Sequence, residues 1–214
     1  MGDFGASETG VSFGRYFKAS INNVDFVAMS EPTPGFANAY PKVGLVVISE
    51  IMYNPSSDRD AEFVEMRNIT GSKVDLFDVE GHTWKFHDDN YGIDYNLPAN
   101  TNIPANGYLL LVKDKSVFQA KYPDVPGGVK IYEWSDGRLD NGGEKIYISM
   151  PGDVDELGRR HYIRVDMVNY DNEAPWPLAA DGGGASPGRV SMQLYGNDPN
   201  NWAAVSPPTP GRCR

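Results

Sequence analysis

The chain has 214 residues, 40% of them hydrophobic, with a formal net charge of -10 and a pI near 4.7. This acidic balance disfavours binding to nucleic acid or to anionic membranes, because both partners would repel the chain. The 16 prolines and 23 glycines interrupt the chain often, which favours short strands over long helices. We therefore expect an all-β protein with one sizeable domain, or one domain and part of a second.

The cysteine content and the search for targeting signals say little about where the protein is located. Cys213 is the only cysteine, so no disulfide can form within the chain. No apolar run approaches the roughly 20 residues of a membrane-spanning helix, and the first residues lack a signal-peptide pattern. We expect no membrane span.

The first element, at residues 11–35, is repeated near the end of the chain. Phe13-Gly14-Arg15 and residues 25–35 (DFVAMSEPTPG) match Pro187-Gly188-Arg189 and residues 201–211 (NWAAVSPPTPG). The spacing from the aromatic residue to the last glycine is the same in both copies, and such self-similarity marks arrays of domains. We predict that residues 1–42 are the terminal segment of a preceding repeat plus a linker, and that residues 43–214 form a complete domain.

The placement of the first copy has two alternatives. A lone strand cannot bury its apolar face, so we expect residues 11–35 to lie along the surface of the complete domain or to add to a sheet edge of a neighbouring molecule. The competing hypothesis is that they form a native first strand, paired centrally in the sheet of this domain.

Strand signals recur from residue 45 onward, as β-branched and aromatic runs bounded by Gly, Pro, Asn and Asp. A short helical turn is expected at residues 115–121. The predicted strands span residues 45–53, 62–69, 74–79, 83–86, 108–113, 130–134, 145–150, 162–170, 191–195 and 202–205.

Two of these strands alternate clearly between apolar and polar residues. Residues 145–150 place Ile146 and Ile148 on one face, and residues 163–167 alternate in the same way. One buried face and one wet face are typical of antiparallel sheets packed as a sandwich. The predicted interior residues are Val64, Met66, Leu109, Leu111, Ile146, Ile148, Val165 and Met167.

Several of these runs together resemble the lamin tail domain family. The matching stretches are VVISEIMYNP at 46–55, EFVEMRN at 62–68, VDL at 74–76, IPANGYLLLV at 103–112 and the closing residues 202–211. The resemblance covers residues 45–211 and implies an immunoglobulin-like antiparallel β-sandwich. Adjacent coiled-coil heptads are missing, and the tandem arrangement is more like the bacterial, exported members than the nuclear lamins. The family has no general catalytic residues, so none are assigned here.

One sequence motif suggests a nucleophile. Gly184-Ala185-Ser186-Pro187-Gly188 has the letters of the Gly-x-Ser-x-Gly elbow of hydrolases, which needs a strand before it and a helix after it. Pro187 follows the serine and has no N–H to donate to an oxyanion. We interpret the motif as a polar loop and expect no enzyme activity.

Metal sites are not predicted. His82, His87 and His161 are neither at zinc spacing nor paired with cysteines. Three acidic clusters offer oxygen atoms to calcium without completing a calcium-loop pattern, so solvated loop charge is the simpler interpretation. They are residues 58–62, residues 87–89 with Asp94, and residues 153–156.

The aromatic residues leave a second function open. Trp84, Trp134, Trp176 and Trp202, with 12 tyrosines, would bind sugars if a pair such as Trp134 and Trp176, or Tyr91 and Tyr95, were exposed. Core packing is the alternative. The function predicted from the resemblance is a non-catalytic interaction or spacer module of a larger, exported bacterial protein, and a carbohydrate-binding accessory domain of an extracellular enzyme is the rival.

The expected setting follows from that prediction. We expect an extracellular or cell-surface location, no cofactor, and a protein or cell-surface partner besides the neighbouring lamin-tail-like domain. No binding residue is assigned from the sequence.

Overall fold

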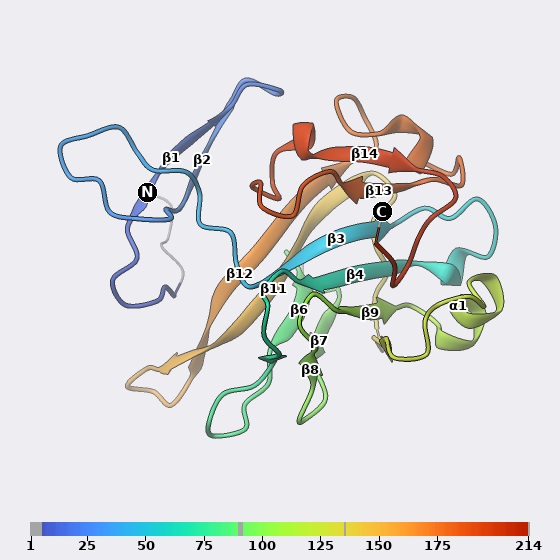
Figure 1. Ribbon diagram of the computed structural model, residues 1–214, viewed down its shortest axis with the longest axis horizontal. Helices are drawn as coiled ribbons and strands as arrows, with labels where there is room; N and C mark the ends of the chain where they lie inside the picture. The colour runs from blue at the N-terminus through green and yellow to red at the C-terminus, as the bar shows by residue number, and fades with distance from the viewer. Residues whose placement is uncertain (1–5, 90–91, 135, 214) are drawn as a thin grey trace.

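The structure is a computed structural model that describes residues 6–89, 92–134 and 136–213. A six-stranded and a four-stranded sheet make up the main body, with a buried core drawn from both (Figure 1). The predicted all-β, immunoglobulin-like sandwich is confirmed, with one parallel strand pair, β9 with β10.

The six-stranded sheet runs in the order β10 (Lys130–Glu133), β9 (Tyr108–Val112), β4 (Phe63–Asn68), β3 (Val46–Met52), β13 (Ser186–Arg189) and β14 (Trp202–Val205). The four-stranded sheet runs in the order β12 (Arg160–Asp171), β11 (Gly143–Val154), β6 (Lys85–Asp88) and β7 (Asp94–Asn96). A further pair joins β5 (Val74–Asp75) to β8 (Asn102–Ile103), and short 3-10 helices cover Arg59–Ala61, Leu178–Ala180 and Pro199–Asn201.

The helix α1 (Lys115–Lys121) connects the parallel strands β9 and β10 and has the predicted bounds. It begins at Asp114, whose carboxylate accepts a hydrogen bond from the Val117 N–H and so satisfies one free donor of the first turn. Its buried Phe118 packs edge-on against Phe63 of β4. This small second core covers one end of the six-stranded sheet.

A β-bulge decides which side chains of β3 face the main core. The register with β4 shifts between Ile48 and Glu50, so Ser49 is an extra residue in the strand. Ile48 and Ile51 both join the main core, whereas Ser49 and Glu50 contact groups outside it. A strictly alternating strand would have placed Ile48 and Ile51 on opposite faces.

A second bulge makes part of the predicted interior wrong. Six of the eight predicted residues are fully buried, but Val165 is half-buried, and Met167 is half-buried on the opposite face of β12. The register between β11 and β12 shifts after Ile148, whose cross-strand partner is Asp166. Asp166 therefore occupies the inward position that a regular strand through Ile163 would have given to Val165 or Met167.

Other strand predictions need correction near the C-terminus. Residues 191–195 form no strand, because the Asn201 side chain accepts from the Ser191 N–H and donates to the Ser191 carbonyl, which holds this segment in a loop. Residues 186–189, interpreted as part of a polar loop, form β13.

The short strands β7 and β8 were not predicted, since neither carries an apolar run.

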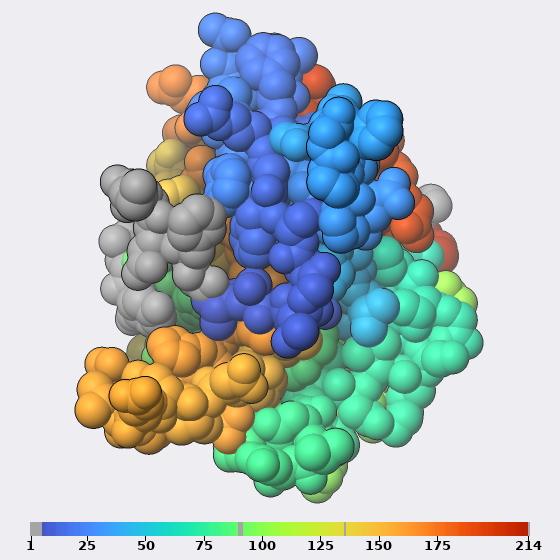
Figure 2. Space-filling view, turned by 90° about the vertical axis from the view of Figure 1, so that its left-hand side faces the viewer, coloured from blue at the N-terminus to red at the C-terminus, as the bar shows by residue number. Residues whose placement is uncertain are grey.

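The N-terminal residues form a separate hairpin. β1 (Phe13–Lys18) and β2 (Asn23–Ala28) pair with each other and with no other strand among the described residues. Figure 2 shows residues 6–40, in blue, as a layer on one face of the molecule. The segment therefore lies on the surface, and central pairing is not what the structure shows.

Candidate interaction site

The N-terminal hairpin rests on the loop between β13 and β14. Val27 and Met29 are buried against Tyr195 of that loop. The Tyr16 ring meets the rings of Tyr195 and Tyr40 edge-on, with centroids 5.4 Å apart in both cases. These residues form a small cluster that is separate from the main core.

Polar contacts orient the hairpin on that loop. Asp25 accepts hydrogen bonds from the Tyr195 hydroxyl at 3.0 Å and from the Asn197 amide at 2.9 Å, and it pairs with Lys18 at 3.0 Å. Burial, followed by the negative charge of Asp25, raises the pKa of Tyr195. Asp25 of the hairpin thus binds Lys18 of its own strand pair and two side chains of the loop between β13 and β14.

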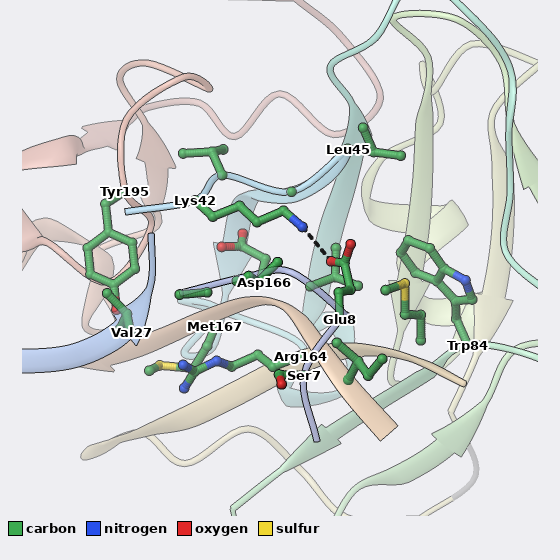
Figure 3. A pocket seen from close by; sticks show the side chains of 17 residues that line it. Ser7, Glu8, Val27, Lys42, Leu45, Trp84, Arg164, Asp166, Met167 and Tyr195 are labelled. Carbon is green, nitrogen blue, oxygen red and sulfur yellow. Dashed lines mark hydrogen bonds and ion pairs between the residues drawn. The ribbon is translucent and has the colours of Figure 1, made fainter. Parts of the chain in front are cut away.

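A hollow of about 240 Å³ lies between the N-terminal segment and β12 (Figure 3). Val27 and Met167 contribute to its apolar lining, and Arg164 and the ion pair of Glu8 with Lys42 contribute its charges. Neither histidine nor cysteine is among the described residues that line it. The lining therefore combines apolar side chains with groups of both charges.

The linker to the main body is held close to β12. A Cβ atom added to Gly44 would lie 2.6 Å from Cγ1 of Val165 and 2.7 Å from its carbonyl oxygen. Only glycine permits this approach. The chain that joins the hairpin to β3 is therefore packed against the body at Gly44.

Ser186 has no catalytic surroundings. It is fully buried in β13, and its hydroxyl donates to the Glu50 carboxylate. Pro187 follows it within the strand, so the helix that a nucleophile elbow requires is not there. The serine is a structural hydrogen-bond donor, and its interpretation as a loop residue was wrong.

Two buried glutamates hold the C-terminal tail. Glu50 accepts from the Thr209 N–H at 2.9 Å and from the Thr209 hydroxyl at 3.0 Å. Glu65 accepts from the Gly211 N–H at 2.6 Å and from the Ser49 hydroxyl at 2.6 Å. Charge-assisted bonds of this kind compensate for burying a carboxylate, so the tail is part of the folded body.

A buried ion pair holds β13 against β12 and β3. Arg189 contacts Asp166 at 2.7 Å, and its guanidinium also donates to the carbonyls of Ile48 and Leu194. Asp166 in turn accepts from the Ile48 N–H at 2.8 Å. The two sheets are therefore joined here by charge as well as by apolar packing.

These polar residues were not predicted from the sequence. One signal was available: Glu50 and Glu65 each interrupt an apolar strand run, VVISEIM and FVEM. A carboxylate at such a position is buried only when donors surround it. The donors come from residues far along the chain, so spacing could not reveal them.

The acidic clusters weighed for calcium are engaged with protein donors. Asp60 pairs with Arg138, and Asp94 pairs with Lys85. Asp88 accepts from two backbone N–H groups, of Gly92 and Ile93, and Asp155 accepts from Leu157 and Arg159. None of these clusters brings three ligand groups together in the part of the chain that the structure describes.

One ligand-like group was not predicted. Asp78, Glu80 and His82 have side-chain ligand atoms within 4.8 Å of one another on a surface turn. The Arg160 guanidinium lies 3.1 Å from His82 Nε2 and 3.3 Å from Glu80, so a cationic side chain already faces the group. The other histidines lie apart: the His87 ring stacks on Tyr147, and His161 is exposed near Asp155.

The tryptophans form no exposed platform. Trp84, Trp134, Trp176 and Trp202 are all buried in the main core. Tyr95 is half-buried against the same core, and Tyr91 lies outside the described residues. These side chains act as core residues, and the described ones form no exposed aromatic pair of the kind that stacks on sugars.

The buried Glu62 and the half-buried Glu144 both have a raised pKa. Burial raises the pKa of Glu62 to about 7, although the Leu139 N–H and Arg138 favour its ionised form. Burial likewise raises the pKa of Glu144 to about 7, although the Asp140 N–H and the Tyr170 hydroxyl bond to it. Both carboxyl groups accept hydrogen bonds from the loop before β11. The strength of these hydrogen bonds therefore depends on pH.

Comparison with known proteins agrees with the fold. The family model of the lamin tail domain matches residues 40–170. No curated protein matches the chain. No helix of the described residues is long and apolar enough to span a membrane. The matched stretch covers β3 to β12, and β13 and β14 complete the same six-stranded sheet. Since the match spans more than half of its residues, the chain belongs to the lamin tail domain family.

Proposed function

We propose that this chain is a non-catalytic interaction or spacer module, one unit of a tandem array in a larger, exported bacterial protein. In this proposal residues 1–42 are the terminal hairpin and linker of a preceding lamin-tail-like repeat, and residues 43–214 are the next repeat. The unit acts at the cell surface or outside the cell, where it spaces or binds other proteins.

The pairing of the two hairpins is the observation that carries the proposal. In β1–β2, Gly14 lies opposite Val27, and in β13–β14 Gly188 lies opposite Ala203. These are equivalent positions in the sequence repeat, so the two hairpins share one register. Chains of unrelated origin have no reason to share both a sequence pattern and its pairing.

Backbone geometry outside the strands supports the same equivalence. Gly10 and Gly184, which precede the hairpins, have φ of 82° and 84°. The turns that follow them also agree: the glycines of the two Thr-Pro-Gly sequences have φ of 82° and 76°. Each turn is closed by a bond from the residue after its glycine to the threonine carbonyl, at 3.1 and 3.2 Å.

The contacts between the hairpin and the body support a spacer role. Asp25, Tyr195 and Asn197 connect the hairpin to the next body by hydrogen bonds, and Gly44 holds the linker close. A short, packed connection restricts the angle between neighbouring domains. An array built in this way is stiffer than one joined by a free linker.

Deletion of residues 1–40 tests the domain assignment. The shortened chain keeps both large sheets and the whole main core, so we expect a single cooperative unfolding transition with a midpoint close to that of the full chain. Urea titration followed by tryptophan fluorescence measures it. Loss of the cooperative transition would reject the assignment of these residues to another repeat.

Polysaccharide titration tests the rival function. With all four tryptophans in the core, we expect no change in tryptophan fluorescence when soluble polysaccharides are added. A saturable change, abolished by substitution of the half-buried Tyr95 with Ala, would favour a carbohydrate-binding module over our proposal.

A further inference from the structure

Five residues fasten the C-terminal hairpin and the turn after it to their own body. The Ser186 hydroxyl and the Thr209 N–H and hydroxyl bind Glu50, the Gly211 N–H binds Glu65, and Arg189 binds Asp166. The fifth residue is Trp202, which is only 5% exposed in the main core.

The N-terminal hairpin carries an equivalent of each of these groups. In the shared register, Ser12 corresponds to the serine, Arg15 to the arginine and Phe26 to the tryptophan. Thr33 and Gly35 occupy the same places in the second Thr-Pro-Gly turn. The repeat therefore preserves the fastening residues as well as the strands.

Within the described residues these equivalents contact no carboxylate. The Arg15 side chain is exposed and has no ion-pair partner in the described part of the chain. The Ser12 hydroxyl reaches only the Glu31 carbonyl, at 3.3 Å, and Phe26 is 48% exposed. The turn at residues 33–35 is largely exposed, whereas its equivalent is held by Glu50 and Glu65.

The two faces of the N-terminal hairpin are used differently. Cross-strand partners share a face, so Arg15 and Phe26 lie on one face, and Tyr16 and Asp25 lie on the other. The second face rests on Tyr195. The first face, which corresponds to the body-facing side of β13–β14, points away from this domain.

We propose that the outward face of β1–β2 and the turn at 33–35 dock on a second lamin tail body, that of the preceding repeat in the same polypeptide. This inference deepens the proposed function and rests on it. The partner surface is a sheet edge like that of β3, with two buried glutamates for the turn and one aspartate for Arg15. The hairpin is then clamped between two bodies, completing the sheet of one and contacting the Tyr195 loop of the next.

The geometry of the free edge fits this partner. β13 lies between β14 and β3, with Gly188 opposite Glu50. β1 has β2 on one side, and on the other only the Asn38 amide donates to the Arg15 carbonyl among the described residues. An open strand edge with an exposed aromatic side chain is the kind of surface that another sheet edge extends.

A chain with two bodies tests the proposal directly. Residues 41–183 are placed before residues 10–214, so that Gly10 takes the position of Gly184 and β1–β2 becomes the only terminal hairpin available to the first body. We expect both bodies to resist limited proteolysis. The double variant Arg15→Met with Thr33→Val should expose only the first body to digestion. The matched double variant Arg189→Met with Thr209→Val should expose only the second body. The masses of the fragments identify which body is digested.

The 214-residue chain without the added body provides the control. Arg15→Met with Thr33→Val should leave its melting midpoint unchanged within about 2 °C, because neither side chain has a hydrogen-bond or ion-pair partner among the described residues. Digestion of the first body despite an intact hairpin would overturn the inference. If the chain without residues 1–40 still unfolds cooperatively in that case, the proposed function stands and only the docking is refuted. A dimer in light scattering would instead assign the hairpin to a second copy and overturn docking within one polypeptide.

Discussion

The ion pair of Arg189 with Asp166 gives the most decisive test of how β13 is held. Arg189 is 2% exposed, and Arg189→Met keeps most of its volume while removing the charge and the bonds to three oxygen atoms. Asp166 would remain buried, and among the described residues the Ile48 N–H would still donate to it. Removing one partner of a buried pair costs roughly 3–5 kcal/mol, because the other charge is left uncompensated.

Two further variants identify the cause of that loss. Asp166→Asn added to Arg189→Met removes the stranded charge while the amide oxygen still accepts from Ile48, so we expect about 1–3 kcal/mol to be regained. Arg15→Met, the repeat-equivalent change at an exposed arginine, should cost less than about 0.5 kcal/mol. Urea titrations followed by fluorescence of the four buried tryptophans measure all three. A loss below about 1 kcal/mol for Arg189→Met, or an equal loss for Arg15→Met, would refute the reasoning.

Three further outcomes follow from the same structure. Glu62 has a pKa of about 7 in the folded chain, above its ordinary value, so the stability it contributes is present in acid and lost as pH rises through 7. Glu62→Gln should therefore stabilise the chain by about 1–3 kcal/mol at pH 8, after allowance for solvent screening, and by much less at pH 5. Thermal melts at both pH values measure this, and equal effects at the two would contradict it. Ser186→Ala should cost about 1–2 kcal/mol by leaving Glu50 one donor short, and an active-site serine probe should not label the wild-type chain; covalent labelling of Ser186 would show the structural role to be wrong. Asp25→Asn should speed amide hydrogen exchange in β1 and β2 by about tenfold or more, with little change in the melting midpoint of the whole chain. Asp75→Asn, at an exposed aspartate, is the control. A large loss of stability of the whole chain would show that the hairpin belongs to the main fold.

Local pattern was sufficient for most strands of the body. The alternation at 145–150 and the apolar runs at 46–52 and 108–112 predict strands because one or both faces must leave water, whatever the partner strand is. The repeat of residues 11–35 at the C-terminus was also readable, and its two copies have the same strand register. Family membership followed from the order of such runs.

Other features depended on partners distant in sequence. Ser186 looks like a loop residue because glycines and a proline surround it, yet Glu50 and Val205 hold it in a strand. Residues 191–195 have strand-forming side chains, yet Asn201 holds them in a loop.

The polar fastening of the two sheets was decided by the tertiary structure alone. A carboxylate such as Glu50 or Asp166 is unfavourable inside a protein until specific donors meet it, and those donors lie up to 159 residues away. The bulges at Ser49 and Val165 likewise arise from pairing between strands, and each one changes which face of its strand is buried. The sequence by itself determined most of the strands, the repeat and the family, because these follow from local burial and residue pattern. Which side chains meet across the sheets depended on long-range pairing, which no local pattern encodes.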